Sequence, residues 1–274
     1  LFSAGLTACG LYAASKVEVN DSRISHFRSS ERIYQAATAF DRVMDGTLYL
    51  DVVIATDQPE ALYRPENLAR IEKLQRFLES LPHIRGTLSL VDYMKFMNRA
   101  MTNDDASAFV LPDSEDLIAQ YALLYSMGES NVLAHVVDNS YKTTIVRALC
   151  NSGLFSDAKM IRDECDRYLR EEFDAPGISA HLSGRLNVDF EWMRHLESSH
   201  FLGALIALLT VWIMTAIGFR TWVAGVYCVV PVLATLVAVY AVMGITGIWL
   251  GLGTSAFASI AIGITVNFSI HELD

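Results

Sequence analysis

The sequence has very little charge in its last quarter. It contains 21 basic and 31 acidic residues in 274, but only Arg220, Glu272 and Asp274 lie after Ser199. The preceding residues carry charge at the density of an ordinary globular domain. The C-terminal part is too poor in charge for a soluble domain. The chain is therefore predicted to join an acidic soluble region to a membrane segment.

Basic charge and catalytic motifs are also scarce. The net charge of −10 argues against nucleic-acid binding, which needs a basic patch, and the 52% hydrophobic content excludes intrinsic disorder. No glycine-rich phosphate loop, zinc-protease motif or nucleophile elbow is present. We therefore expect no enzyme, no catalytic residue, no cofactor and no metal site.

Cysteine is rare, with four residues in the chain. Cys9 and Cys228 lie in apolar segments, whereas Cys150 and Cys165 lie in the soluble region. The latter two would form a disulfide or remain unpaired as small apolar residues, and the second interpretation is preferred.

The apolar region is long enough for several membrane spans. Residues 201–219 are uncharged and would span roughly 28 Å as a helix, about one bilayer core. Residues 221–271 also lack formal charge, and their expected break is Gly244–Gly247. Three transmembrane helices are predicted, at residues 198–219, 222–243 and 249–272. Residues 1–15 are predicted to be the end of a further transmembrane helix, which makes the chain a fragment of a longer protein.

The orientation follows from Arg220, the only basic residue between these helices. Basic residues in short loops favour the cytoplasm. The large domain at residues 16–197 is accordingly predicted on the opposite side of the membrane.

Residues 16–197 alternate strand and helix patterns. Strand–helix–strand occurs twice, at about 46–90 and 132–182, and the second copy includes a predicted hairpin of Val132–Val137 and Thr143–Leu149. The prediction is an α+β domain with two βαβ-type lobes, followed by one long helix from about Asn187 into the membrane.

The last predicted span carries polar or small residues at every fourth position: Ser255, Ser259, Gly263, Asn267 and His271. Such a row drifts by only about 40° per step around a helix, and the isoleucines of this segment are expected largely elsewhere. One interpretation is a helix-packing stripe of small residues, chiefly Ser255, Ser259 and Gly263. The other is a polar path lined by Asn267 and His271, although His271 also suits the membrane edge.

The stretch from Ser259 to His271, SIAIGITVNFSIH, resembles the fourth transmembrane helix of the resistance–nodulation–division (RND) superfamily, in its MMPL and hydrophobe-exporter branch. Members commonly read S-I-A-[IL]-G-I-G-V-D-Y-x-I-H there. Looser similarity covers Gly218–Arg220, Pro231, Val19–Ser22, Pro65–Gln75 and Ser89–Tyr93.

The resemblance implies the N-terminal half of a multi-pass transporter in the bacterial inner membrane, with a periplasmic porter-like domain. It implies membrane lipids, a hydrophobic small-molecule or lipid substrate and a missing C-terminal half as partners, and it leaves room for a homo-oligomer. It also implies proton-driven transport through carboxylates in helices four and ten of the full protein. This chain has Asn267 and Phe268 where the family has Asp and Tyr.

Because an amide cannot titrate, three explanations compete. The relay rests on the other half, or His271 replaces it, or the protein is not proton-coupled; the first is preferred. The leading hypothesis is an exporter of hydrophobic or lipid-like substrates. The rival is a transport-inactive or uncoupled relative that acts as a lipid-binding or regulatory membrane protein. A membrane-anchored periplasmic enzyme has no motif to support it.

Overall fold

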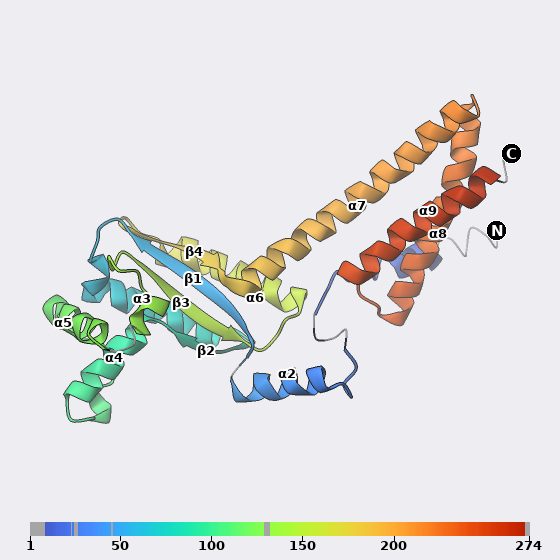
Figure 1. Ribbon diagram of the computed structural model, residues 1–274. Coiled ribbons are helices and arrows are strands. Elements are labelled where there is room, and N and C mark those ends of the chain that lie inside the picture. The colour runs from blue at the N-terminus through green and yellow to red at the C-terminus, as the bar shows by residue number, and fades with distance from the viewer. Residues whose placement is uncertain (1–8, 23, 25–26, 45, 129–131, 272–274) are drawn as a thin grey trace. The chain divides into compact units, whose positions relative to one another are not determined.

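The computed structural model describes residues 9–271 except 23, 25–26, 45 and 129–131 (Figure 1). These residues form two compact units. The sheet unit is the described part of Arg23–Phe190, and the helical unit is the described part of Leu1–Ser22 with Glu191–Asp274. The chain thus has a mixed α+β unit and an all-helical unit. Of the predicted helix end at residues 1–15, residues 1–8 lie outside the described residues, and residues 9–14 are helical.

The sheet unit is built on one four-stranded antiparallel sheet in the order β2-β3-β1-β4. Its main elements in chain order are β1 (Leu48–Thr56), α3 (Pro65–Ser80), β2 (Ile84–Leu88), β3 (Thr143–Cys150), α6 (Phe155–Tyr168) and β4 (Ile178–Ser183). The smaller ones are α4 (Leu90–Met101), α5 (Glu115–Ser126), the 3-10 turns η2 (Ala61–Tyr63), η3 (Ala106–Ala108) and η4 (Val132–His135), and the π-helical turn η5 (Leu169–Phe173).

The two βαβ units interleave in this sheet and do not form separate lobes. β3 lies between β1 and β2, and β1 lies between β3 and β4, with every neighbouring pair antiparallel. This is the split βαβ, or ferredoxin-like, arrangement. The α+β class is as predicted, but two lobes side by side are not what the described residues form. Two strand–helix–strand repeats have the same local sequence pattern whether they form separate lobes or one interleaved sheet. Only the long-range strand pairing distinguishes the two arrangements.

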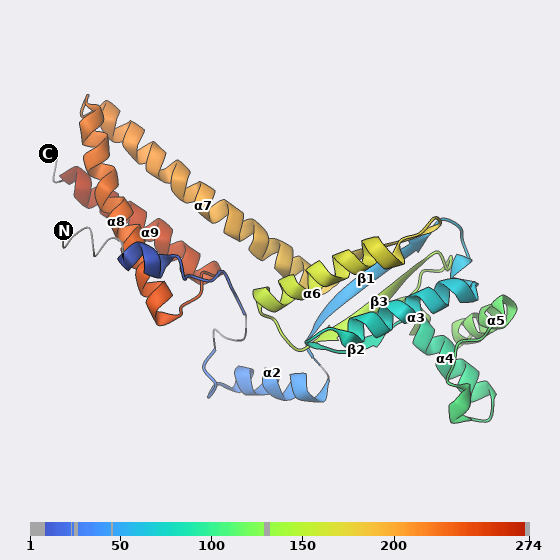
Figure 2. The same ribbon diagram turned by 180° about the vertical axis from the view of Figure 1, so that it is seen from behind.

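One face of the sheet supports the core. β3 alternates half-buried and buried residues, and its inward side chains include Val146 and Ala148. Figures 1 and 2 show α3 and α6 covering the same face of the sheet. α3 contributes an apolar stripe to the core, and Pro65 occupies its first turn, where the missing amide hydrogen is tolerated. The stripe is fully buried at Leu68, Ile71, Leu74 and Leu78.

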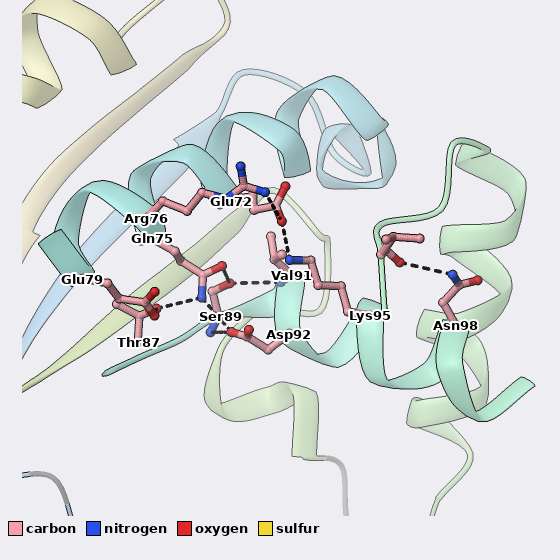
Figure 3. Close-up of polar contacts among 11 residues, drawn as sticks. Glu72, Gln75, Arg76, Glu79, Thr87, Ser89, Val91, Asp92, Lys95 and Asn98 are labelled. Atoms are coloured by element: carbon pink, nitrogen blue, oxygen red, sulfur yellow. Dashed lines mark hydrogen bonds and ion pairs between the residues drawn. The ribbon is translucent and has the colours of Figure 1, made fainter. Parts of the chain in front are cut away.

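A polar network joins α3 to the start of α4 (Figure 3). The Ser89 hydroxyl donates to Gln75 Oε1 at 2.9 Å and accepts from the Val91 amide at 3.0 Å. Asp92 Oδ2 accepts from the Ser89 amide at 2.8 Å and from Gln75 Nε2 at 2.7 Å. Each buried polar group of this network therefore has a hydrogen-bond partner, and α4 begins with a capping box.

The predicted hairpin is only half correct. Val132–His135 forms the 3-10 turn η4, and a single bridge joins Val137 to Thr144. The turn itself is present, because Asp138 Oδ1 accepts from the Lys142 and Thr143 amides at 2.9 and 2.7 Å. A run of apolar residues as short as this one does not distinguish strand from helix by its periodicity.

The helical unit contains α7 (Gly184–Gly218), α8 (Trp222–Thr246) and α9 (Leu252–His271), and α7 also extends into the sheet unit. Among the described residues, these three helices are long and apolar enough to cross a membrane. The expected continuous helix through Asn187 is present as α7. The break after α8 falls at Gly247, within the expected Gly244–Gly247, and this glycine adopts a left-handed conformation with φ of 71°. α8 itself ends at Thr246, three residues later than the predicted end at residue 243.

The segment that leads out of the helical unit is fixed to the α8–α9 loop. Val19 forms a bridge with Leu250, and the Leu250 amide donates to Glu18 O at 2.9 Å. On α8, a Cβ atom at Gly244 would lie 1.9 Å from Ala13 O, so only glycine permits this backbone approach. Residues 13–20 therefore run along the end of α8 and the loop after it.

Candidate functional site

The predicted site residues all lie on α9, whose inward side packs against α8. Ser255, Ala258 and Ser269 are buried there. The Thr265 hydroxyl lies 3.3 Å from the Thr235 hydroxyl of α8 and donates to Ala261 O at 2.8 Å. Small and hydroxylated residues thus make the α8–α9 contact, which permits close approach of two helices in an apolar environment.

The four-residue row does not follow this inward side. Ser255 is buried at one end of it, but Ser259, Gly263, Asn267 and His271 are exposed. A Cβ atom added at Gly263 would meet nothing within 4 Å. The drift of about 40° per step carries the row away from α8, so that Asn267 lies roughly opposite Ala258 around the helix. The structure places these residues together on the open side of α9.

Two isoleucines share this open side. Ile260 and Ile264 are each 55% exposed, and Phe268 beside them is 67% exposed. Ile260 lies only about 20° from Asn267 around the helix, closer than the spacing of the row suggested. The open side is consequently a mixed surface with an amide and an imidazole among aliphatic groups.

A small cavity of about 200 Å³ lies between α7 and the N-terminal half of α9. It is lined by His200, Gly203 and Ala207 of α7 and by Ala258, Ser259 and Ile262 of α9, together with neighbouring small side chains. His200 Nε2 lies 2.5 Å from the Tyr240 hydroxyl of α8. A polar contact between two helices therefore borders a space lined mainly by small residues. Tyr240 was not predicted, because no local signal links two residues 40 positions apart.

α7 and α8 approach each other closely near their connecting turn. A Cβ atom at Gly225 would lie 2.6–2.9 Å from Trp212 atoms. The rings of Trp212 and Trp222 lie 5.0 Å apart, and Arg220 occupies the turn with φ of 54°. Bulky indoles flank the glycine contact, which fixes how these two helices pack.

The sheet unit has a hollow of about 250 Å³ beside α5 and η4. Leu123, Leu133 and Val137 supply apolar walls, and Tyr63 and Tyr141 contribute two rings whose centroids lie 4.6 Å apart. Burial, together with Tyr141 and Glu60, raises the pKa of Tyr63 to about 12. Ser126, Asp138 and Asn139 also line the hollow, so its surface is mixed. It combines apolar walls and phenols that are neutral at physiological pH with one carboxylate, and its apolar side suits a small hydrophobic group.

The described residues contain no group of three His, Cys, Asp or Glu side chains that could hold a metal ion. Cys150 and Cys165 are buried and unpaired, which agrees with the preferred interpretation of the sequence. Burial raises the pKa of both thiols, that of Cys165 to about 12, so neither is a thiolate nucleophile.

Comparison with protein-family models finds no match to this chain. Comparison with curated proteins likewise finds no relative. The resemblance stated above therefore rests on the residues of the fourth predicted helix and on the order of the elements.

Proposed function

We propose that this chain is the N-terminal half of an RND-superfamily transporter that exports hydrophobic or lipid-like substrates and is proton-driven in the full protein. The observation that carries the proposal is α9, where the motif from Ser259 to His271 presents Asn267 and His271 on a side that α8 does not cover. The order of an α+β unit, one continuous helix and two further apolar helices supports it.

Polar groups are costly to place in hydrocarbon. An amide without a hydrogen-bond partner is expensive to transfer into an apolar medium, and polar residues within membrane helices therefore usually face other helices or water. Asn267 lies on the open side of a candidate span. We infer that a second set of helices, from the C-terminal half, covers this side and forms a polar path with it.

The proton chemistry would then reside mainly on the partner half. An aspartate in a low-dielectric site couples protonation to conformation because desolvation shifts its pKa. Asn267 cannot titrate, but its side chain can donate a hydrogen bond to a carboxylate and accept one from a protonated acid. In this scheme Asn267 orients a carboxylate of the other half, and His271 lies at the mouth of the path.

We further propose a bacterial inner-membrane location with the sheet unit, as the porter-like domain, on the periplasmic side. The support is Arg220 in the short α7–α8 turn, since basic residues in such turns favour the cytoplasm. A hydrophobic substrate group would bind in the hollow lined by Tyr63 and Tyr141. Membrane lipids, the second half and further copies of the protein are the expected partners.

The test is transport of a fluorescent phospholipid by the full protein in proteoliposomes under an imposed pH gradient. The proposal predicts transport that requires the gradient. Replacement Asn267→Leu should abolish it, because α9 then presents no amide to the path, while Ile264→Leu on the same side of α9 should preserve it. Transport that ignores the gradient would contradict proton coupling.

The second candidate is a lipid-binding or regulatory membrane protein that retains the fold without pumping. It is favoured by one observation, the pair Asn267-Phe268 in place of Asp-Tyr. In that case the full protein would bind the same fluorescent lipid with no gradient-dependent movement, and the matching helix of the second half would also carry a neutral pair.

A further inference from the structure

A pocket of about 490 Å³ lies at the C-terminal end of α8, and its lining residues all belong to the helical unit. Residues 15–18 form one wall. The other wall is the last turn of α8 with the loop after it, from Met243 and Gly244 to Ile248 and Trp249. The pocket falls within the roughly 300–1,000 Å³ that binding sites for small molecules occupy. It shares no residue with the open side of α9 or with the hollow of the sheet unit.

Backbone contacts hold the two walls together. The Leu250 amide donates to Glu18 O at 2.9 Å, and the Asn20 amide donates to Leu250 O at 3.3 Å. On α8, Gly244 approaches the first wall so closely that a Cβ atom there would lie 1.9 Å from the Ala13 carbonyl oxygen. The pocket is thus a fixed corner of the helical unit.

The length of α8 places this pocket at the level of lipid headgroups. Its 25 residues extend about 37 Å, whereas the hydrocarbon core of a bilayer is about 30 Å thick and the headgroup regions bring the total to about 40–45 Å. A helix of this length that spans the bilayer therefore ends among headgroups. Trp249 lies just after the helix and is half-buried, and tryptophan is typical of that level. Exposed side chains at Ile245 and Ile248 give an acyl chain an apolar surface next to the pocket.

One charge of each sign borders the pocket. Lys16 and Glu18 are exposed, and neither forms an ion pair with a described residue. The Lys16 ammonium lies 4.8 Å from the ring centroid of Tyr12. The indole N–H of Trp249 also has no acceptor among the described residues. The pocket thus offers two donors and one carboxylate that the described part of the chain leaves without polar partners.

The balance of charge favours a ligand that carries both signs. Asp21, the next charged residue of the described chain, lies beside Gly251 in the loop after α8, with its Cγ 3.3 Å from the position of a Cβ atom there. The positive charge of Lys16 is therefore matched by nearby carboxylates, and a purely anionic ligand gains little. A headgroup with a phosphate and an ammonium can place each charge opposite its counterpart, and charge-assisted hydrogen bonds are among the stronger ones.

We propose that this pocket binds the headgroup of a phospholipid that carries a phosphate and a primary amine. The phosphate lies at Lys16 and the indole N–H of Trp249, the ammonium lies at Glu18, and an acyl chain runs along Ile245. The bound lipid would hold residues 15–18 against the end of α8. This inference needs only the membrane spans, and it does not depend on the transport activity or on its direction.

The test is native mass spectrometry of the full protein in detergent, titrated with phosphatidylethanolamine or with phosphatidylglycerol of the same acyl chains. Phosphatidylglycerol has the phosphate but no amine. Lys16→Gln and Glu18→Gln each remove one charge from an exposed side chain, so neither should disturb folding. The matched control is Lys159→Gln, which removes an exposed charge from α6 in the sheet unit.

The proposal predicts that the wild type binds phosphatidylethanolamine more tightly than phosphatidylglycerol. Each pocket variant should weaken phosphatidylethanolamine binding roughly threefold to fivefold, the effect of losing one partly screened ion pair, whereas Lys159→Gln should leave it unchanged. Glu18→Gln should also remove the preference for the amine lipid.

Unchanged phosphatidylethanolamine affinity in either pocket variant would overturn the proposal. Full displacement of the lipid by an equal concentration of soluble phosphorylethanolamine would also overturn it, since the pocket would then be a site for a small soluble phosphate.

Discussion

The two units place their apolar side chains in opposite ways. In the sheet unit, the long aliphatic residues of α3 and β1 are inside, as Leu50, Leu68 and Leu74 illustrate. In the helical unit, residues of the same type, such as Leu205 and Val230, are exposed. The interior there is rich in small or hydroxylated residues, among them Thr215, Ala216, Ala224, Cys228 and Ala258, although Val232 and Leu236 are buried with them.

This inversion is what two different solvents produce. In water, burial of aliphatic surface is the main favourable term in folding. In lipid, that term vanishes between helices, and close packing of small residues replaces it. The contrast therefore supports a membrane environment for α7, α8 and α9 more strongly than hydropathy alone, because it concerns which side of each helix is apolar.

The largest effect is expected from the same substitution made once in each unit. Leu74→Ala removes a fully buried side chain and should lower the free energy of unfolding of the sheet unit by about 2–5 kcal/mol. Leu205→Ala on the exposed side of α7 should change stability by no more than about 0.5 kcal/mol. Hydrogen exchange of the protein in lipid vesicles measures both. Comparable losses in the two variants would break the contrast.

A smaller effect is expected at the glycine contacts of the helical unit. Gly225→Ala places a methyl group against Trp212 and should destabilise the α7–α8 packing by about 1–3 kcal/mol. The matched control is Gly203→Ala, because a Cβ atom there meets nothing within 4 Å. Thermal unfolding in detergent compares the two. If Gly203→Ala proved as harmful as Gly225→Ala, the assigned packing would be wrong.

The smallest effect is electrostatic and belongs to the sheet unit alone. Burial raises the pKa of Glu72, but hydrogen bonds from Lys95 and Arg76 outweigh it and lower the pKa below 4.5. A lowered folded-state pKa contributes stability above about pH 4.5 that is lost as the pH falls through the folded value. Glu72→Gln should therefore cost less than about 1 kcal/mol at neutral pH, because water screens the pair.

The check is a pair of denaturant titrations at neutral and acidic pH. The difference between wild type and Glu72→Gln should shrink at acidic pH. It should also shrink in a Lys95→Met background, since the partner charge is gone. A difference that is constant with pH would assign the effect to packing.

Local pattern predicted much of the sheet unit. The helix α3 is predictable from local pattern, because Leu68, Ile71, Leu74 and Leu78 repeat with the helical period and Pro65 marks its start. The pairing of β1 with β3 could not be predicted in this way. It brings Asp51 next to Arg147, 96 positions further along the chain, and no local pattern encodes such a partner. Residues Val132–Val137 were predicted to be a strand because a short run of mainly apolar residues fits a strand or a helical turn.

The sequence predicts that the candidate site residues share one side of a helix, but it does not predict whether that side is covered or exposed. The four-residue spacing placed Asn267 and His271 on one side of α9, whereas only the α8 contact shows which side remains open. The helix α2 (Arg32–Val43) was not predicted, although Ile33 and Phe40 have helical spacing. None of its residues is fully buried, so a short helix of this kind has no buried apolar stripe to mark it.

The most direct test of the account asks whether the open side of α9 faces a polar path or lipid. In the full protein in vesicles, with Cys9 and Cys228 replaced by alanine, Asn267→Cys is compared with Val226→Cys. Both positions lie four residues from a helix end, and Val226 is an exposed residue of α8. The account predicts that a water-soluble thiol reagent modifies Asn267→Cys and leaves Val226→Cys intact. Equal protection of both cysteines would place Asn267 in lipid and contradict the proposed path.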